Sequence, residues 1–187
     1  MPHLILPFTW TLFFTFWGYK ALNVKSTERH EAVLSRAVHI AAWAAAAGLA
    51  FTPWLRFGWL GMRWLPHGAL LFPLGMAITW LGLGIAIWAR RYLGSNWSAS
   101  VTLKKGHELV RSGPYALVRH PIYTGALLAM LGTAVADAEL RGLVALFLLG
   151  ISFWRKIRIE ERWLTEHFGD GYHRYQREIK ALVPFVA

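Results

Sequence analysis

Long apolar stretches alternate with short charged segments along most of the chain. A helix needs roughly 20 apolar residues to cross the hydrocarbon of a bilayer. Five stretches approach this length, at residues 4–19, 37–55, 68–89, 122–136 and 140–154. We therefore predict an all-α membrane protein of about five transmembrane helices, forming a single integral membrane domain over residues 1–187.

The fourth and fifth stretches are the shortest, and only Asp137, Ala138 and Glu139 separate them. This spacing predicts a tight helical hairpin, with a buried or re-entrant helix as the alternative for either segment. Small residues predict close helix contacts in the second and third stretches, at Ala41, Ala42, Ala44 to Gly48, Gly75, Gly82 and Gly84.

Lysine and arginine are distributed unevenly between the apolar stretches. Seventeen of the 20 lie in residues 20–36, 90–119 and 155–187, and the other three are Arg56, Arg63 and Arg141. Because cytosolic segments are enriched in these cations, the loop 90–119 and the tail 155–187 are predicted to be cytosolic, with the N-terminus outside. No cleavable signal peptide is expected, since no basic segment precedes the first stretch.

The composition excludes several classes of protein. Hydrophobic residues make up 56% of the chain, with 11 Trp and 11 Phe, and the mean hydropathy is +0.36, which is unusual for a soluble domain. The chain has no cysteine, which excludes disulfides and thiolate chemistry, and no metal site is predicted. The net charge of +10 lies in short segments between apolar runs, so no nucleic-acid partner is expected.

The tail has a helical pattern. Residues predicted to share one face are Trp154, Ile157, Glu161, Leu164 and Phe168. Gly169, Asp170 and Gly171 then break this helix, and a second short helix is predicted through Tyr172, Tyr175 and Ile179. Both are expected on the cytosolic side, along the membrane surface or folded over the loop 90–119.

Polar residues gather where the fourth apolar stretch begins. Ser112, Gly113 and Pro114 predict a turn, and Pro121 suits the first position of a helix. Arg119 and His120 would then lie at the helix N-terminus, which favours a carboxylate or phosphate. The alternative is that these residues are interfacial and that Tyr115 and Tyr123 belong to an aromatic belt.

A second polar group, residues 155–161, follows the fifth stretch. Its adjacent acids, Glu160 and Glu161, could form a solvated face among cations. The helical pattern instead turns one of them inward, where it needs a partner such as a cationic ligand or ribose hydroxyls.

Together these segments carry a family resemblance. Gly-Pro-Tyr-Ala-Leu-Val-Arg-His-Pro-Ile-Tyr-Thr-Gly at 113–125, followed by Glu-Glu-Arg-Trp-Leu-Thr-Glu-His-Phe-Gly-Asp-Gly-Tyr-His-Arg-Tyr at 160–175, resembles the isoprenylcysteine carboxyl methyltransferases and the related phospholipid N-methyltransferases. The resemblance covers residues 104–184. It implies an S-adenosylmethionine-dependent methyltransferase whose cofactor pocket lies among transmembrane helices and is closed by the cytosolic tail, without a Rossmann domain.

The resemblance also implies site residues. Those expected at S-adenosylmethionine are His107, Glu108, Leu109, Val110, Tyr115, His120, Pro121, Ile122, Tyr123 and Glu160, with Glu161 as the alternative to Glu160. Those expected at the reaction centre are Arg119, His120, Lys156, Arg158 and Glu161. Lys156 stands where the isoprenylcysteine enzymes have an arginine for the substrate carboxylate, so recognition of that group is not simply inherited.

The expected reaction is a direct, in-line methyl transfer to a lipophilic acceptor that enters from the bilayer. The expected partners are therefore membrane lipids and this acceptor, while the oligomeric state stays open. A carboxylate or thiolate needs no base, whereas an ammonium must first lose a proton, for which His120 or Glu161 is the candidate. Phospholipid N-methylation and small-thiol S-methylation are alternatives within the family, and a small transporter or scaffold is the alternative outside it.

Overall fold

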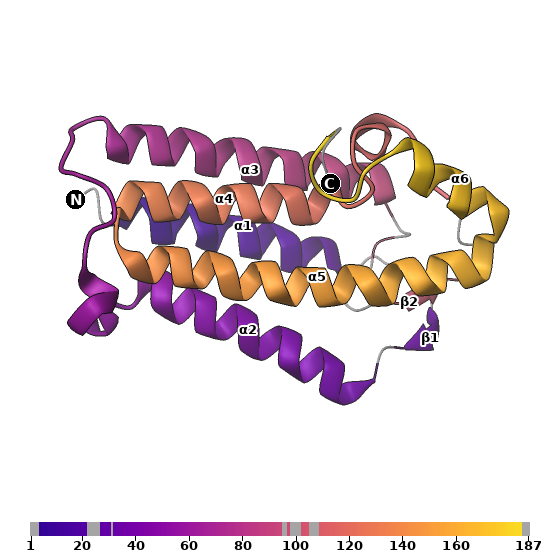
Figure 1. Ribbon diagram of the computed structural model, residues 1–187, viewed down its shortest axis with the longest axis horizontal. Helices are drawn as coiled ribbons and strands as arrows, with labels where there is room; N and C mark the ends of the chain where they lie inside the picture. The colour runs from indigo at the N-terminus through magenta and orange to yellow at the C-terminus, as the bar shows by residue number, and fades with distance from the viewer. Residues whose placement is uncertain are drawn as a thin grey trace.

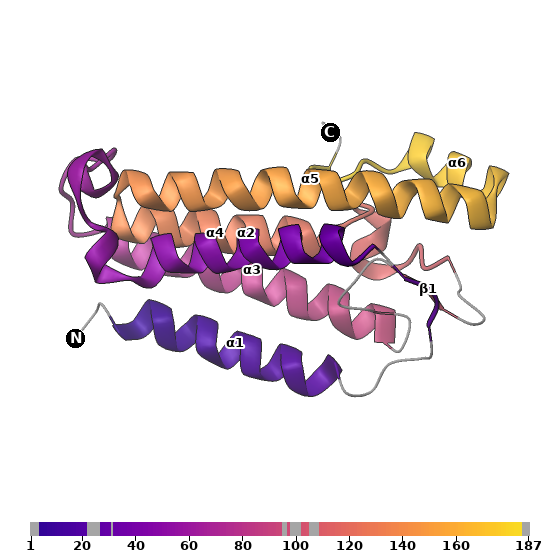
Figure 2. The same cartoon turned by 90° about the horizontal axis from the view of Figure 1, so that it is seen from below.

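The computed structural model describes residues 4–21, 27–30, 32–94, 97, 102–104 and 109–184. Within this part, five long helices run along the length of the molecule and a short one folds back at one end (Figure 1). These helices are α1 (Ile5–Ala21), α2 (Val33–Phe51), α3 (Leu71–Leu93), α4 (Pro121–Asp137), α5 (Leu140–Phe168) and α6 (Asp170–Glu178). Helices α3, α4, α5 and α2 lie in a row (Figure 1), and α1 lies along one side of it (Figure 2).

Each predicted apolar stretch overlaps one of the long helices, with shifted ends. The second was predicted at 37–55, but α2 is Val33–Phe51. Thr52 is extended, with φ −93° and ψ 113°, because the ring of Pro53 disfavours a helical residue before it. Short 3-10 turns, η2 (Pro53–Leu55) and η3 (Gly58–Gly61), follow instead.

The outside of the bundle is apolar. Large side chains such as Phe8, Trp54, Trp80 and Phe147 are more than half exposed, as expected where lipid and not water is the solvent. Helices α2 and α3 are long and apolar enough to cross a membrane, and α4 is a shorter apolar helix. These observations confirm the prediction of a helical membrane fold, without fixing the number of spans.

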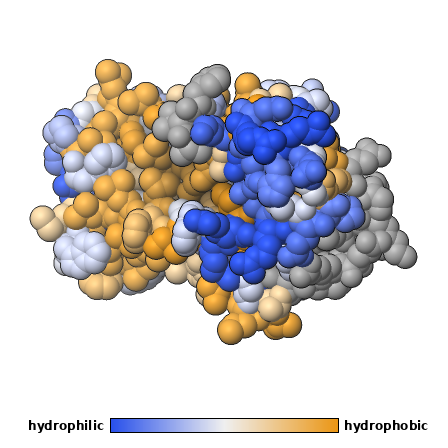
Figure 3. Space-filling view, turned by 45° about the vertical axis from the view of Figure 1, so that its right-hand side comes forward, coloured by the Kyte–Doolittle hydropathy of each residue, from blue (hydrophilic) through white to orange (hydrophobic). Residues whose placement is uncertain are grey.

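Helix α5 is longer than predicted because the fifth apolar stretch and the first tail helix are one continuous helix of 29 residues. At 1.5 Å per residue it is about 43 Å long, beyond the roughly 30 Å of bilayer hydrocarbon. It ends at Gly169, whose φ of +54° suits glycine. Hydrophilic residues gather at this end of the molecule, which we call the polar end (Figure 3). It holds the C-terminal ends of α1, α3 and α5, the N-terminus of α4, and α6.

The predicted hairpin between α4 and α5 is present. Ala138 adopts a left-handed conformation, with φ +56°. The segment before α3 holds the turn through two backbone hydrogen bonds, from Trp64 N to Ala138 O (3.0 Å) and from Leu140 N to Met62 O (2.9 Å).

Glycines bring α3 and α4 into backbone contact. A Cβ on Gly82 would lie 2.4 Å from Ala129 N, and one on Gly75 would lie 2.4 Å from Ala136 N. Gly125 and Gly132 face them from α4 in the same way. The prediction of close contact is confirmed at Gly75 and Gly82 and wrong at Gly84, which faces open space with nothing within 4 Å. Gly84 lies two residues, about 200° around the helix, from Gly82.

Helix α2 uses few of its small residues for burial. Ala46 and Ala50 are its buried residues, and they join a core shared by α1, α3, α4 and α5. That core contains Trp10, Phe13, Ala46, Ala50, Leu83, Ala86, Ala126, Ala129, Met130, Ala145, Leu149 and Phe153. Trp10 also donates a hydrogen bond of 3.0 Å from Nε1 to Thr133 Oγ1, which fixes α1 against α4.

Two features were not predicted. Strands β1 (Thr27–His30) and β2 (Thr102–Lys104) form a small antiparallel sheet with His30 opposite Thr102. Arg141, one of the three cations outside the basic segments, is only 2% exposed. Its NH1 donates to the carbonyls of Leu49 (2.7 Å) and Ala50 (3.2 Å), so it caps the C-terminal end of α2.

Candidate active site at the polar end

The turn before α4 positions the first group of polar side chains. It is a 3-10 turn, η5 (Gly113–Ala116), and Gly113 has φ +58°. This positive φ favours glycine, and the position packs closely on α3, since a Cβ on Gly113 would lie 2.3 Å from Cε1 of Tyr92. The turn directs Tyr115 into the protein, where it is 6% exposed.

An ion-pair cluster joins the start of α4 to α5. His120 lies between both acids, with Nδ1 3.4 Å from Glu160 and Nε2 3.1 Å from Glu161. Arg119 binds Glu161 through NH2 at 2.6 Å and through Nε at 2.8 Å. Both acids therefore point toward α4, whereas the sequence pattern predicted that one of them would.

Tyr123, one turn into α4, extends this cluster. Its hydroxyl donates to Glu160 Oε1 at 2.5 Å. Its ring stacks on His120 at 5.6 Å between centroids and on Phe153 at 4.6 Å. Lys156 Nζ lies 5.7 Å from the centre of the same ring, and this lysine is 5% exposed. Tyr123 therefore lies close to both a buried lysine and a carboxylate.

Helix α6 and the segment after it cover the cluster. The backbone N–H groups of Arg119 and His120 donate to the carbonyls of Lys180 (2.8 Å) and Ala181 (3.0 Å). The Arg119 side chain donates to the carbonyls of Gln176 and Ile179. Gln176 Nε2 donates to Glu161 Oε2 at 3.2 Å.

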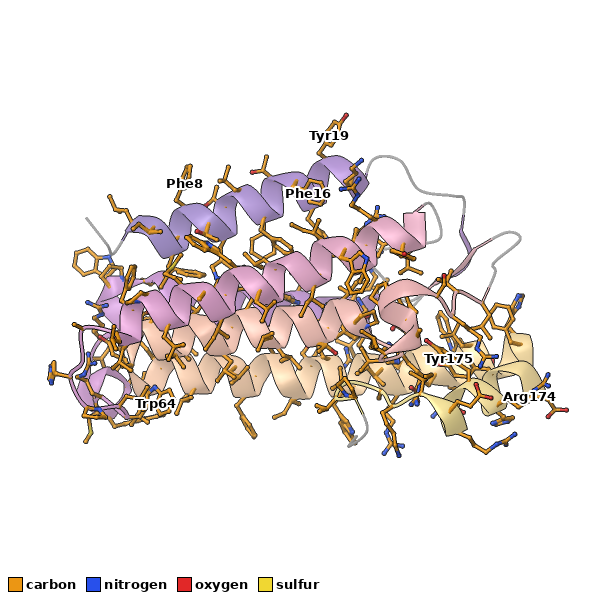
Figure 4. The ribbon with its side chains drawn as sticks, turned by 90° about the horizontal axis from the view of Figure 1, so that it is seen from above. Phe8, Phe16, Tyr19, Trp64, Arg174 and Tyr175 are labelled. Atoms are coloured by element: carbon orange, nitrogen blue, oxygen red, sulfur yellow. The ribbon has the colours of Figure 1, made fainter. Side chains whose placement is uncertain are left out.

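The aromatic side of α6 faces η5. Tyr175 points toward the turn, whereas Arg174 points away from the bundle (Figure 4). The Tyr175 hydroxyl donates to the Tyr115 carbonyl at 2.5 Å. Burial raises the pKa of Tyr175 to about 12, so its hydroxyl remains a hydrogen-bond donor near neutral pH.

The cluster shifts the titration of its own groups. Burial works to lower the pKa of His120, but the hydrogen bonds with Glu160 and Glu161 outweigh it and raise this pKa. Burial works to raise the pKa of Glu161, but His120 and Arg119 lower it to about 2. His120, Lys156 and Tyr123 likewise lower the pKa of Glu160 against burial. The favoured state is a histidinium between two carboxylates.

These shifts predict how stability changes with pH. A raised histidine pKa stabilises the fold fully below the ordinary value of 6.5 and less as pH rises through the folded pKa. A lowered glutamate pKa stabilises it fully above the ordinary 4.5 and less as pH falls toward about 2. We therefore expect the contribution of the cluster to be largest between pH 4.5 and 6.5 and to decline on the alkaline side.

Thermal unfolding in a mild detergent between about pH 5 and 9 measures this decline. His120→Gln should flatten the alkaline side of the curve. His173→Gln, a change at an exposed histidine on α6, should leave it as in the parent. An alkaline decline that persists unchanged in His120→Gln would contradict the assignment.

The structure brings most of the predicted site residues together. Those in or beside the cluster are Arg119, His120, Pro121, Ile122, Tyr123, Lys156, Glu160 and Glu161. Tyr115 lies next to it, where its carbonyl accepts from Tyr175 of α6. Leu109 and Val110 are half-buried before η5, and His107 and Glu108 lie outside the described residues.

Two side chains predicted on α5 are placed differently. Arg158 is exposed and lies over the ring of Trp154, 5.1 Å from its centre, instead of facing the cluster. Trp154 is itself 58% exposed, although it was predicted to share one face of the helix with Glu161. The two lie on one side of α5, but α6 packs back only over the later part of that side.

Sequence reasoning missed several members of the site. Phe153 was treated as part of an apolar span, and Gln176 lies in a polar helix without a motif that marks it. The carbonyls of Lys180 and Ala181 contribute through backbone atoms, which no residue type identifies. One sequence signal for this part of the site was the pair Tyr172 and Tyr175, whose apolar rings indicate that α6 packs against the protein. Both are buried in the structure.

Comparisons with known proteins agree on one family. The family model for phospholipid methyltransferases matches residues 70–171. The protein-S-isoprenylcysteine O-methyltransferase of Schizosaccharomyces pombe is 34% identical over 99 residues, covering 50% of this chain and 41% of its own length. The Saccharomyces cerevisiae enzyme of that name is 33% identical over 116 residues, covering 60% and 48%.

Two further relatives extend the comparison. The cobalt-zinc-cadmium resistance protein CzcN of Cupriavidus metallidurans is 32% identical over 124 residues, covering 65% of this chain and 54% of its own. The solved eukaryotic intramembrane Ras methyltransferase ICMT (isoprenylcysteine carboxyl methyltransferase) superposes with a TM-score of 0.58 and 25% identity, covering 84% of this chain and 55% of that one. The chain spans about half the length of the curated relatives it matches.

Proposed function

The chain belongs to the phospholipid methyltransferase family, and from that membership we propose that it is an integral membrane methyltransferase. The proposed reaction transfers a methyl group from S-adenosylmethionine to the carboxylate of a lipophilic acceptor. S-adenosylmethionine, when bound, supplies a methyl group on a cationic sulfur that is ready for nucleophilic attack. The observation that carries the proposal is the meeting of His120, Glu160 and Tyr123 at one point.

The proposed topology has five spans, with the N-terminus outside and the polar end in the cytosol. The bounds of α1 to α5 and the apolar exterior support it. The positions of lysine and arginine support the orientation, since cytosolic segments are enriched in both. The site would then lie at the inner boundary of the membrane, where a lipid tail and a water-soluble cofactor can both arrive.

The residues present fit S-adenosylmethionine by their chemistry. Carboxylates accept hydrogen bonds from ribose hydroxyls, and aromatic faces attract a sulfonium by about 0.5 to 2 kcal/mol. Glu160 is the acceptor we assign, because its side chain is 22% exposed and carries fewer contacts than Glu161, with His120 and Tyr123 as its bonding partners among the described residues. Glu161 is held by Arg119, His120 and Gln176 and is therefore assigned to positioning.

Other residues of the family motif would complete this binding site. Tyr115 and Tyr123 supply the aromatic faces, and Pro121 and Ile122 the first turn of α4. Leu109 and Val110 would line the approach before η5. His107 and Glu108 retain their proposed cofactor role, which rests on the motif alone.

The cluster favours an acceptor that needs no base. Two carboxylates hold the proton on His120. Arg119 and His120 lower the pKa of Glu161 to about 2, so this acid is ionised near neutral pH. Neither residue is therefore suited to remove a proton from an ammonium group. A carboxylate acceptor is already a nucleophile, and Lys156 offers a buried cation near which it can be held.

Binding of the cofactor tests the proposal directly. The detergent-solubilised protein should bind S-adenosylhomocysteine saturably in equilibrium dialysis. Glu160→Gln should weaken binding roughly tenfold or more, because a hydrogen bond to a charged group contributes about 1.5 to 3 kcal/mol. Tyr123→Phe should weaken it less.

Glu178→Gln is the matched control, since it removes an exposed carboxylate of α6 that pairs with Arg111. Its affinity should equal that of the parent. No saturable binding at millimolar cofactor would overturn the proposed function, whereas normal binding to Glu160→Gln would overturn only the site assignment.

A second candidate function is N-methylation of an amino-phospholipid, which the description of the matching family favours. Membranes containing the protein and a donor labelled in its methyl group distinguish the two. A methyl ester releases its label as volatile methanol in mild base, whereas an N-methyl group keeps it. We expect base-labile label, and base-stable label in phospholipid would show the second function.

A further inference from the structure

A hollow runs along α3 toward the polar end and is lined in its wider part by residues of α3 itself, including Tyr92, whose ring also contacts Gly113 of η5. Its wider part, about 580 Å³, is lined by Gly84, Ile87, Trp88, Arg91 and Tyr92. A second part of about 300 Å³ lies where α1 and α3 end, lined by Phe16, Lys20, Arg90, Arg91 and Gly94. Arg91 borders both, so the cationic part adjoins the apolar part.

Three cations gather in the cationic part. Arg90 is 4% exposed and fastens the two helices, donating to the carbonyls of Gly94 (2.7 Å) and Lys20 (2.8 Å). It also lies 4.2 Å from the ring centre of Trp97. Lys20 and Arg91 are exposed, and no carboxylate in the described part of the chain forms an ion pair with either. Like charges held together repel one another unless an anion lies between them.

The apolar part can hold a segment of a lipid chain. Gly84 has nothing within 4 Å of where its Cβ would be, which leaves a groove beside Ile87 and Trp88. From Gly84 to Arg91 the helix rises about 10 Å. Phe16 projects from α1 on the side of α3, whereas Tyr19 points away from the bundle (Figure 4). Phe16 therefore closes the hollow beside the cations.

We propose that this hollow binds one anionic phospholipid, with an acyl chain in the groove at Gly84 and Trp88 and the phosphate between Lys20 and Arg91. The charge of the site selects the head group, because each lysine or arginine near an anionic lipid contributes about 1 kcal/mol. A zwitterionic lipid carries a cation of its own and gains less. The site lies on α1 and α3, apart from the cluster at His120, and its occupancy does not depend on methyl transfer.

Native mass spectrometry of the full chain, released from a neutral detergent, tests the proposal. With phosphatidylglycerol and phosphatidylcholine of matched chains in competition, the parent should retain the anionic lipid with roughly tenfold preference or more. Lys20→Gln and Arg91→Gln should each weaken its binding about fivefold. Gly84→Leu, which fills the groove, should also weaken it.

Two variants serve as controls. Arg36→Gln removes an exposed cation near the start of α2 and should bind as the parent does. Arg91→Lys keeps the charge and should retain binding, which separates the loss of a cation from a failure to fold. Equal retention of both lipids would overturn the proposal, as would unchanged binding in Arg91→Gln or Gly84→Leu. Full displacement of the lipid by millimolar inorganic phosphate would also overturn it, because the groove would then contribute nothing.

Discussion

Replacing Glu161 with glutamine is expected to lower the free energy of unfolding by about 3 kcal/mol, because it leaves a buried cation without its partner. The side chains of Arg119 and Glu161 are only 10% and 17% exposed. The same acid also binds His120 and Gln176, so one substitution loosens the start of α4, α5 and α6 together. Unfolding of the purified protein by titration with a denaturing detergent gives this difference.

The control is again Glu178→Gln. In the parent, Glu178 pairs with Arg111, and their side chains are 57% and 42% exposed. An exposed pair of this kind contributes about 0 to 1 kcal/mol. Should both variants lose the same amount, the cluster would have no special role in stability. Arg119→Gln should also destabilise the protein. Arg119→Lys should destabilise it less, because lysine keeps the charge but not the two-nitrogen contact with Glu161.

Gly82→Ala is expected to destabilise the protein by about 1 to 3 kcal/mol, since the added methyl group overpacks a backbone contact. Its Cβ would lie 2.4 Å from Ala129 N and 2.5 Å from Gly125 O, and neither backbone atom can rotate away. Helix α4 must move outward, and it carries Arg119 and His120 at its start. Cofactor affinity is therefore expected to fall together with the unfolding midpoint.

Gly84→Ala is the matched comparison, since it makes the same chemical change two residues along the same helix. Nothing lies within 4 Å of its Cβ, and alanine favours a helix over glycine by up to about 1 kcal/mol. We expect equal or greater stability for this variant in the same assay. Equal changes in stability in both variants would mean that the contact with α4 does not set the result.

Most of the helical fold could be predicted from the sequence, because local patterns determine it. The apolar stretches, the start of α4 at Pro121 and the break at Gly169 each depend on a few neighbouring residues. The pairing of β1 with β2 joins segments more than 70 residues apart, and no local pattern encodes it. The burial of Arg141 likewise depends on carbonyls at the end of α2, which the surrounding sequence does not reveal.

The sequence predicted which residues form the candidate site better than it predicted the directions in which their side chains point. The two motifs named Arg119, His120, Tyr123, Glu160 and Glu161, and these side chains lie together. Periodicity along α5 could not place Arg158, because the side of a helix that is covered depends on where α6 packs. For the same reason Gln176 and the carbonyls after α6 could not be predicted.

The hydrogen bonds from Arg119 and His120 to the carbonyls of Lys180 and Ala181 have a consequence for biosynthesis. A ribosome makes residues 180 and 181 only after all five long helices have been translated. The segment that covers Glu160 and Glu161 is therefore the last part of the site to be made. A fusion partner attached directly after residue 187 would act on this late step, whereas one placed ahead of α1 would leave it undisturbed.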